Sequence, residues 1–276
     1  MFSEIIKNVK NNTPLVHNIT NYVTVNDCAN ILLACGGSPI MADDIEEVEE
    51  IVSISSALVI NIGTLNSRTI ESMIKAGKKA NELNIPVILD PVGVGASSLR
   101  TDTANKLLNE IKFAVVRGNI SEIKALGITD AKGAKGVDAD LADSINEENL
   151  DEVVEYIKSL SEKLSSVVAV TGAIDIVSDS KKTYIIRNGH PMMGKISGTG
   201  CMLSSIIGAY CGANKDNIID ATAAAVCIIG LSGELAYEKI LKNDEGTSML
   251  RTHLIDFMSK IDDEILEEGA KFEIRQ

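Results

Sequence analysis

Short apolar segments alternate with longer amphipathic segments through much of this chain, and no other feature of the sequence restricts the fold as strongly. Four apolar segments end directly in polar or glycine-containing turns and are predicted to be strands; they span residues 58–62, 87–89, 113–116 and 167–170. Helices are predicted between successive strands, over residues 67–83 and 102–111 and from Ser121 onward. Strands that alternate with helices of this length form βαβ units, which build a parallel sheet covered on both faces. The pattern predicts a three-layer α/β/α fold with a mostly parallel central sheet.

The remaining segments are assigned by the same reasoning. Residues 15–30 are rich in Asn and Thr and are predicted to form a ligand-lining loop that leads into a helix over 28–35. Further helices are predicted over 45–55, 202–210, 217–241 and 249–269, a hairpin over 174–177 and 184–186, and a surface excursion over 127–149. Because the chain shows no linker and no internal repeat, we predict one domain over residues 1–276.

The charge and the apolar segments exclude several classes of protein. A formal net charge of -13 disfavours a nucleic-acid partner, because no segregated basic face is visible. The longest apolar candidate, residues 221–231, is too short to span a membrane, and the N-terminus lacks the apolar core of a signal peptide, so a cytoplasmic protein is expected. The five cysteines show no CxxC spacing, which indicates neither disulfides nor a zinc site.

The segment Ser197-Gly198-Thr199-Gly200-Cys201 runs directly into an apolar helix and is typical of a helix N-terminus that binds an anion. Glycines allow a ligand to approach the backbone, and the first-turn N–H groups lack partners within the helix. The dinucleotide fingerprint is excluded because Leu203 stands where its third glycine belongs, and a Walker A loop is excluded because Ile196 replaces its Ser or Thr. A tight turn before a buried helix is the alternative interpretation.

Polar residues follow the predicted strands and are expected to share one edge of the sheet, because ligands bind at the carboxyl ends of parallel strands. They are Thr64, Asp90, Arg117, Asn119, Glu122 and Thr171. Asp90 and Glu122 would suit magnesium, directly or through water, and Arg117 would suit a phosphate. Taken singly, each residue is better explained by a structural role: Asp90 as a turn residue, Glu122 in a helix first turn and Arg117 in an ion pair. Their occurrence together at strand ends weakens that explanation.

Cys201 is predicted to be the most informative single residue. A thiol at a helix N-terminus can have its pKa lowered toward neutrality, which would make Cys201 a base or a nucleophile. A buried capping residue is the alternative. His17 and His190 are possible proton carriers, although hydrogen-bonding structural roles are more common for a histidine in a loop.

Several blocks of the sequence resemble the hydroxyethylthiazole kinase family. They occur in order over residues 14–21, 38–42, 61–65, 89–93, 117–122, 170–172 and 198–201. The similarity extends from about Pro14 to Gly212, and the C-terminal helices carry no recognisable signature. The resemblance implies a ribokinase-like fold, a homotrimer with active sites between subunits, and ATP-dependent phosphorylation of 4-methyl-5-(2-hydroxyethyl)thiazole, with Mg2+, in thiamine salvage.

The resemblance also implies roles for individual residues. Met41 and Gly198 would contact the thiazole alcohol, while Asn21 and Val23 would line its pocket and Gly63 and Thr64 would reach in from a neighbouring subunit. Arg117 and Thr171, with Thr199 and Gly200 at the helix terminus, would contact ATP, and Asp90 and Glu122 would hold the metal. Thr199 stands where the family is expected to have alanine and adds a phosphate contact.

Two questions stay open at the level of the sequence. Wider ribokinase-like relatives have an aspartate base where this chain has Cys201, so Cys201 is either a base or a group that only orients the hydroxyl. The alternative functions are a nucleotide-dependent dehydratase of hydrated NAD(P)H and a non-catalytic nucleotide or thiazole sensor. The Asn-rich loop and the Met41 block favour a small alcohol over a dinucleotide.

Overall fold

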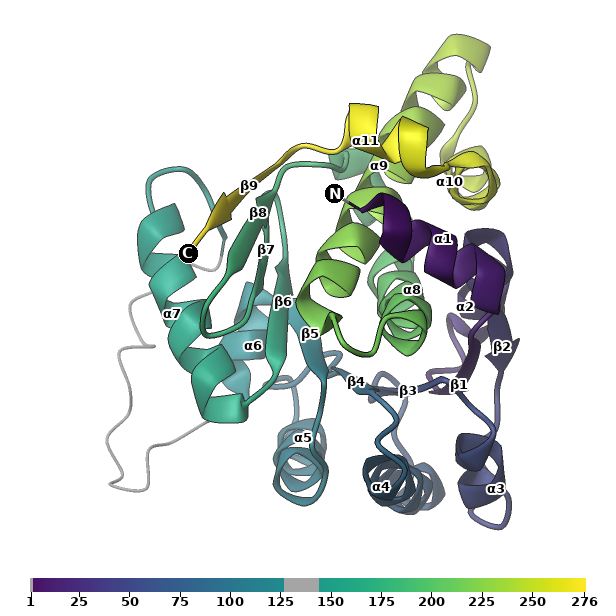
Figure 1. Cartoon of the computed structure of the whole chain (residues 1–276), viewed down its shortest axis with the longest axis vertical. Coiled ribbons are helices and arrows are strands. Elements are labelled where there is room, and N and C mark those ends of the chain that lie inside the picture. Colours follow the sequence, from purple (N-terminus) through teal and green to yellow (C-terminus); the bar gives the residue numbers. More distant parts are fainter. Residues whose placement is uncertain (1, 127–143) are drawn as a thin grey trace.

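The structure, a computed structural model, describes residues 2–126 and 144–276 and contains one mixed sheet within them (Figure 1). The strand order is β2-β1-β3-β4-β5-β6-β7-β8-β9, and the pairs from β2 to β6 are parallel whereas β7, β8 and β9 are added antiparallel. The strands are β1 (Leu15–Ile19), β2 (Ser38–Ile40), β3 (Ala57–Asn61), β4 (Val87–Asp90), β5 (Val115–Asn119), β6 (Val167–Thr171), β7 (Asp175–Ser178), β8 (Thr183–Ile186) and β9 (Phe272–Arg275).

Helices cover both faces of the sheet, which confirms the three-layer prediction (Figure 1). One face carries α1 (Ser3–Asn12), α2 (Val25–Cys35), α8 (Thr199–Ala213), α9 (Ile218–Asn243), α10 (Thr247–Lys260) and α11 (Asp263–Gly269). The other face carries α3 (Val48–Ser53), α4 (Ser67–Glu82), α5 (Ser98–Glu110), α6 (Ile120–Ala125) and α7 (Leu150–Leu164). A 3-10 helix, η2 (Pro191–Lys195), precedes α8.

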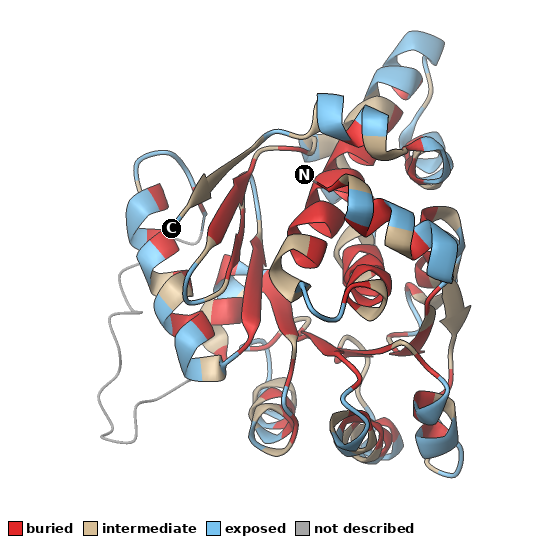
Figure 2. Ribbon diagram, in the orientation of Figure 1, coloured by how far each residue is buried: buried red, intermediate tan, exposed pale blue. Residues whose placement is uncertain are grey.

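The central strands are buried on both sides, so that successive residues contribute to two different cores (Figure 2). In β3, Val59 packs in the core beneath α8, whereas Leu58 and Ile60 pack in the core above α4. This explains why the strands appear in the sequence as continuous apolar runs rather than as an alternating pattern. The two cores fix the sheet rigidly between the helical layers.

Helix α8 lies directly against the sheet because it presents a glycine there. A Cβ atom at Gly208 would lie 2.7 Å from a methyl group of Val59 and 2.9 Å from one of Val16. The absence of that atom lets the helix approach β1 and β3 closely, and it contacts β4 as well. The N-terminus of α8 is thereby carried to the carboxyl ends of these strands.

The structure corrects three of the predicted elements. The polar segment that was expected to be a loop contains strand β1, because its polar side chains find buried partners: His17 Nε2 lies 2.7 Å from the Ala42 carbonyl, and Asn18 Oδ1 accepts from Ser205 at 2.9 Å. The helix predicted over 45–55 is shorter, and β2 precedes it. The C-terminal helix is divided into α10 and α11, and strand β9 follows.

The remaining predicted strands, helices and the β7–β8 hairpin occur in the expected order, with ends that differ by a few residues. Most of the excursion predicted over 127–149 lies outside the described residues. Within the described ranges, α9 is long and apolar enough to cross a membrane, but most of it is buried inside the protein, as a core helix is.

Candidate active site

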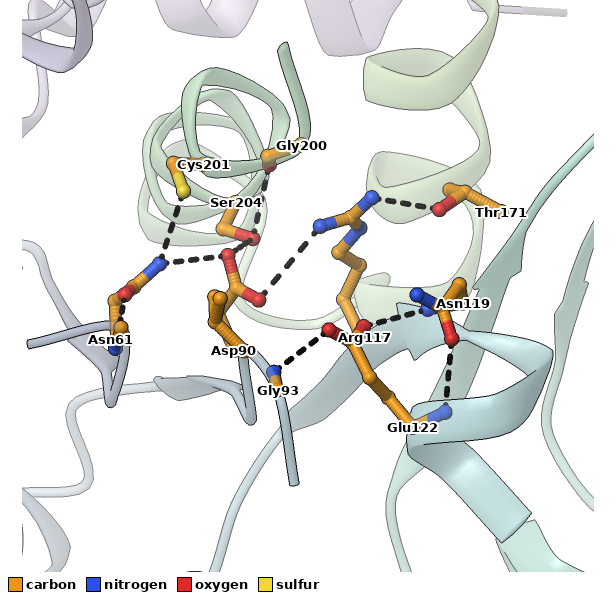
Figure 3. Close-up of polar contacts among 12 residues, drawn as sticks. Asn61, Asp90, Gly93, Arg117, Asn119, Glu122, Thr171, Gly200, Cys201 and Ser204 are labelled. Carbon is orange, nitrogen blue, oxygen red and sulfur yellow. Dashed lines mark hydrogen bonds and ion pairs between the residues drawn. The ribbon is translucent and has the colours of Figure 1, made fainter. Parts of the chain in front are cut away.

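Polar side chains from four neighbouring strands meet the N-terminus of α8 at the carboxyl edge of the sheet (Figure 3). They are Asn61 at the end of β3, Asp90 at the end of β4, Arg117 and Asn119 on β5, and Thr171 at the end of β6. The parallel pairing aligns these ends, since Asn61 is in register with Asp90 and Asn119 with Thr171. The prediction that the strand ends share one edge is therefore confirmed for Asp90, Arg117, Asn119 and Thr171, and Asn61 joins them.

Asp90 lies at the centre of this cluster and has no solvent exposure. Its Oδ2 atom accepts hydrogen bonds from Ser204 Oγ at 2.7 Å and from Asn61 Nδ2 at 2.9 Å. Its Oδ1 atom is buried without a hydrogen-bond donor and lies 3.6 Å from Nη1 of Arg117. Burial raises the pKa of the Asp90 carboxyl, although the Arg117 charge opposes the shift.

Arg117 connects Asp90 to the next strand. Its Nη2 atom donates to Thr171 Oγ1 at 2.6 Å, and its side chain extends along the first turn of α8. A Cβ atom at Gly200 would lie only 2.5 Å from Nη1, so that this glycine makes room for the guanidinium group. The structure thus brings together the predicted ATP-binding residues Arg117, Thr171 and Gly200.

Glu122 caps helix α6 and supports the neighbouring turn. Its Oε2 atom accepts from the Asn119 backbone N–H at 2.9 Å, while Asn119 Oδ1 accepts from the Glu122 N–H at 2.8 Å, which forms a capping box. Its Oε1 atom accepts from the Gly93 N–H at 2.8 Å. Glu122 also raises the pKa of Asp90 electrostatically. Glu122 therefore caps helix α6 and also lies close enough to Asp90 to affect its charge.

The fit of a metal ion rests on Asp90 and Glu122. The described part of the chain contains no group of three or more His, Cys, Asp or Glu side chains that is arranged around a metal. Magnesium, however, needs only one or two protein carboxylates when phosphate oxygens and water complete its shell. The buried Oδ1 atom of Asp90, which lacks a donor, suits such a cation.

Cys201 lies on the opposite side of Asp90 from Arg117 (Figure 3). Its Sγ atom accepts from Asn21 Nδ2 at 3.2 Å and from Asn61 Nδ2 at 3.3 Å. The expectation of a lowered pKa is wrong: burial and the Asp90 charge raise the pKa of the Cys201 thiol, and these effects outweigh the donors around the sulfur. Cys201 is partly exposed, whereas the other four cysteines are buried.

The first turn of α8 is open to a ligand. Gly198 occupies the N-cap position with φ of 92°, a left-handed conformation that favours glycine, and no side chain caps the helix. A Cβ atom at Gly198 would lie 2.4 Å from the Thr24 side chain. The N–H groups that begin α8 therefore have the geometry that was predicted for an anion-binding helix terminus.

A cavity of about 660 Å³ opens beside this helix terminus. Arg117, Asn119, Thr171, Thr199 and Gly200 line it on the side of the strand ends. The rest of its wall is formed by Gly172, Ala173, Asp175, the segment 188–191, Met193, Gly194, Leu203, Val226, Ile229 and Gly230. Its lining combines polar groups such as Arg117 and Thr171 with apolar side chains such as Leu203, Val226 and Ile229, a combination typical of small-molecule sites.

Asp175 in this cavity was not predicted from the sequence. Its Oδ1 atom accepts from the Gly172 N–H at 2.8 Å, and burial raises its pKa to about 7. The only signal in the sequence is its position four residues after Thr171, at the start of a predicted hairpin strand. Asn61 and Ser204 were also missed as site residues, because their partners are distant in the sequence and come together only in the fold.

Among the predicted acceptor-side residues, Asn21 is the one with a hydrogen bond to the Cys201 thiol in the described structure. Asn21 is buried and bonds to Cys201, while the Gly63 N–H donates to Asn61 Oδ1 at 2.9 Å and Thr64 Oγ1 accepts from the Tyr22 N–H at 3.3 Å. These contacts lie within one chain. No hydrogen bond in the described structure joins Val23 or Met41 to Cys201; Val23 is 63% exposed, and Met41 directly follows β2.

The two predicted histidines have structural contacts. His17 is buried in β1, and burial lowers its pKa, so it stays neutral against the Ala42 carbonyl. His190 accepts from the Met192 N–H at 3.2 Å and stacks on Tyr237 with ring centroids 3.5 Å apart, although it also lines the cavity. Neither ring contacts Cys201 or Asp90 through a described hydrogen bond.

Comparison with known proteins identifies a family over almost the whole chain. Residues 6–264 match the hydroxyethylthiazole kinase family. The hydroxyethylthiazole kinases of Clostridium acetobutylicum and Clostridium tetani are 58% and 53% identical, over 99% and 98% of this chain and 99% and 96% of theirs. The structure of the hydroxyethylthiazole kinase protein of Pyrococcus horikoshii is 36% identical and superimposes with a TM-score of 0.87, covering 100% of this chain and 99% of that one.

A more distant structure supports the fold alone. A ribokinase-like superfamily protein of Enterococcus faecalis is 13% identical and has a TM-score of 0.60, covering 94% of this chain and 95% of that one. The ribokinase-like fold predicted from the sequence is confirmed.

Proposed function

The chain belongs to the hydroxyethylthiazole kinase family, and on that premise we propose that it transfers the γ-phosphoryl group of ATP to the hydroxyl of 4-methyl-5-(2-hydroxyethyl)thiazole in thiamine salvage. The observation that carries the proposal is the placement of Cys201 and Arg117 on opposite sides of the buried Asp90, beneath the open terminus of α8. That arrangement supplies an acceptor side and a nucleotide side that meet at one helix end.

ATP occupies the 660 Å³ cavity in this proposal, with its phosphates toward Arg117, Thr171, Thr199 and Gly200. The guanidinium group and the first-turn N–H groups of α8 stabilise the negative charge of the transferred phosphoryl group. Thr171 and Asp90 hold Arg117 in position, so its charge is preorganised at the helix terminus. Preorganised donors of this kind supply most of the stabilisation that phosphoryl transfer requires.

Magnesium would be held by Asp90 and Glu122, directly or through water, and when bound it neutralises charge on the phosphates. The contribution of the chain is to keep these two carboxylates in position. Ser204 and Asn61 orient the Asp90 carboxylate, and the Gly93 and Asn119 N–H groups orient Glu122.

The acceptor alcohol docks beside Cys201, with Met41 and Gly198 against the alcohol and Asn21 and Val23 along the thiazole. Gly63 and Thr64 complete the pocket of a neighbouring subunit in a cytoplasmic homotrimer, which light scattering of the purified protein tests directly. The exposed position of Val23 is compatible with a pocket that a neighbouring subunit covers.

Cys201 orients the acceptor hydroxyl and is not a preformed base. Because burial and Asp90 raise its pKa, the thiol stays protonated near neutral pH. A loose transition state depends more on alignment and charge neutralisation than on a strong base, so a neutral thiol is sufficient. Cys201→Ala is expected to lower kcat while the protein stays folded. Cys211→Ala, which removes a buried thiol of the same helix, serves as the control; parental turnover by Cys201→Ala would end the catalytic assignment.

The decisive assay measures ADP release by the purified protein with ATP and Mg2+, with and without the thiazole alcohol, followed by mass analysis of the product. Thiazole-dependent ADP together with the mass of a phosphate ester establishes the kinase. A folded protein that binds ATP but forms neither product contradicts the proposal and returns attention to the dehydratase and sensor functions.

A further inference from the structure

Asn61 occupies an unusual place in the site, because one buried amide contacts four separate groups. Figure 3 shows two of them, Asp90 and Cys201. The residue is 2% exposed at the end of β3. Its Oδ1 atom accepts from the Gly63 N–H at 2.9 Å and from Asn21 Nδ2 at 3.1 Å. Its Nδ2 atom donates to Asp90 Oδ2 at 2.9 Å and to Cys201 Sγ at 3.3 Å.

The orientation of this amide is fixed by its partners. The Gly63 N–H can only donate, so it must face Oδ1, and the buried Asp90 oxygen then faces Nδ2. Rotating the amide by 180° would place two donors together at Gly63 and two oxygens together at Asp90. Since both hydrogens of Nδ2 are engaged, one always points at Asp90 and the other at the Cys201 sulfur.

The sulfur atom therefore receives two amide donors, one from Asn61 and one from Asn21. A thiol that accepts two hydrogen bonds must direct its own hydrogen away from both donors. Cys201 is thus held in one orientation by groups from β3 and from the segment after β1, and not by its own helix.

We propose that Asn61 is a positioning residue that fixes the orientation of the Cys201 thiol and, through its two hydrogen bonds, couples it to the Asp90 carboxylate. The proposal rests on the proposed kinase function only for its catalytic consequence, since the thiol environment can be measured without turnover. Asn61 links the two halves of the site: the acceptor side at Cys201 and the phosphate side at Asp90 and Arg117.

The thiol itself provides a readout that does not depend on activity. Cys201 is the partly exposed cysteine of the five, so iodoacetamide should label it selectively, with Cys201→Ala as the blank. Asp90 is the titratable group that raises the pKa of Cys201, and Cys201 in turn raises the pKa of the buried Cys28. Because amide N–H donors stabilise a thiolate, loss of the Asn61 donor should raise the midpoint of the alkylation pH profile by about one pH unit.

Asn61→Leu and Asn61→Asp test this expectation in two ways. Leucine removes the donor without adding charge. In Asn61→Asp, the carboxyl group keeps the oxygen that accepts from Gly63 and Asn21. Any proton on its second oxygen is shared with Asp90, so no donor remains for the Cys201 sulfur. Both variants should raise the midpoint, Asn61→Asp more, and should lower kcat by about tenfold or more with little change in the KM for ATP.

Asn18→Leu is the matched control. Asn18 is also a buried amide, lies on β1 and accepts a hydrogen bond from Ser205 of α8, but it does not contact Cys201. This variant should leave the alkylation midpoint unchanged even if it lowers the melting temperature. The proposal is overturned if a folded Asn61 variant keeps the parental alkylation midpoint, or if Asn18→Leu shifts that midpoint equally. If Asn61→Leu does not fold, the result for Asn61→Asp decides.

The kinase assay and the alkylation assay fail independently. If the parent protein shows no thiazole kinase activity but the Asn61 variants shift the thiol midpoint, the positioning role stands and the proposed function falls. If the parent phosphorylates the thiazole and the midpoint does not respond to Asn61, the function stands and the positioning role falls.

Discussion

Gly200→Ala should separate ATP binding from stability, because the three atoms nearest to the added methyl group all belong to the side chain of Arg117. The Cβ atom would lie 2.5 Å from Nη1, 2.8 Å from Nη2 and 3.0 Å from Cζ of Arg117. The guanidinium group must therefore retreat by about 1 Å to reach ordinary van der Waals separation. It spans Thr171 and Asp90, so a movement of this size disturbs the 2.6 Å hydrogen bond or the 3.6 Å ion pair.

The magnitude follows from the contact that is disturbed. A hydrogen bond of a charged group contributes about 1.5–3 kcal/mol, which corresponds to about 10- to 150-fold in the KM for ATP if Arg117 no longer meets the phosphates. Alanine is the better helix former by about 1 kcal/mol in a helix interior, and less in a first turn, so the melting temperature should change little.

A double-mutant cycle with Arg117→Ala tests the mechanism. If the methyl group acts by displacing the guanidinium group, adding Gly200→Ala to Arg117→Ala should raise the KM for ATP no further. The assay is steady-state ADP release at varied ATP, with melting temperatures measured for all four proteins. An unchanged KM in Gly200→Ala, or full additivity in the double variant, would refute the reasoning.

Three further predictions concern pH, metal and packing. The folded-state pKa of Asp175, about 7, lies above its ordinary value of 3.8, so ionisation of this group lowers the stability of the fold as pH rises from 4 to 7. Asp175→Asn keeps an oxygen for the Gly172 N–H and should be more stable than the parent at pH 8 by about 1–2 kcal/mol. Urea titrations should show that this difference in stability vanishes near pH 4. Glu122→Gln should raise the Mg2+ concentration for half-maximal activity about tenfold, equivalent to ~1.4 kcal/mol, and an unchanged requirement would remove Glu122 from the metal site. Gly208→Ala crowds two valines of β1 and β3, and because overpacking costs about 1–3 kcal/mol against about 1 kcal/mol of helix propensity, its melting temperature should fall by a few degrees; an increase would contradict the close packing of α8.

Local patterns were sufficient to predict most of the sheet, because its central strands are buried on both faces. Continuous apolar runs such as Val87 to Leu89 permit few other structures when helices flank them. Strand β1 was not predicted, because its sequence includes polar residues. His17 and Asn18 are polar in the sequence, and only the fold supplies the Ala42 carbonyl and the Ser205 hydroxyl that make their burial possible.

The candidate site was predictable where chemistry follows a strand end and not where it depends on contacts between distant segments. Asp90 and Thr171 end their strands and Arg117 lies within β5, and parallel pairing then places them together. Asn61 also ends a strand, but its importance comes from four partners that the sequence separates by up to 140 residues. The pKa of Cys201 was predicted in the wrong direction because the helix terminus is visible in the sequence, whereas burial and the Asp90 charge are not.

The charge of the cavity supports the proposal that a metal ion acts together with the helix terminus. Arg117 is the only Arg or Lys among the described lining residues, and Asp90 shares its charge. One shared cation cannot balance a triphosphate in a protein of net charge -13. The first-turn N–H groups of α8 contribute directed partial charge, but only about half an elementary charge in total. We therefore expect a cation to bind together with the nucleotide, and the buried Oδ1 atom of Asp90, which has no hydrogen-bond donor, is placed to receive one.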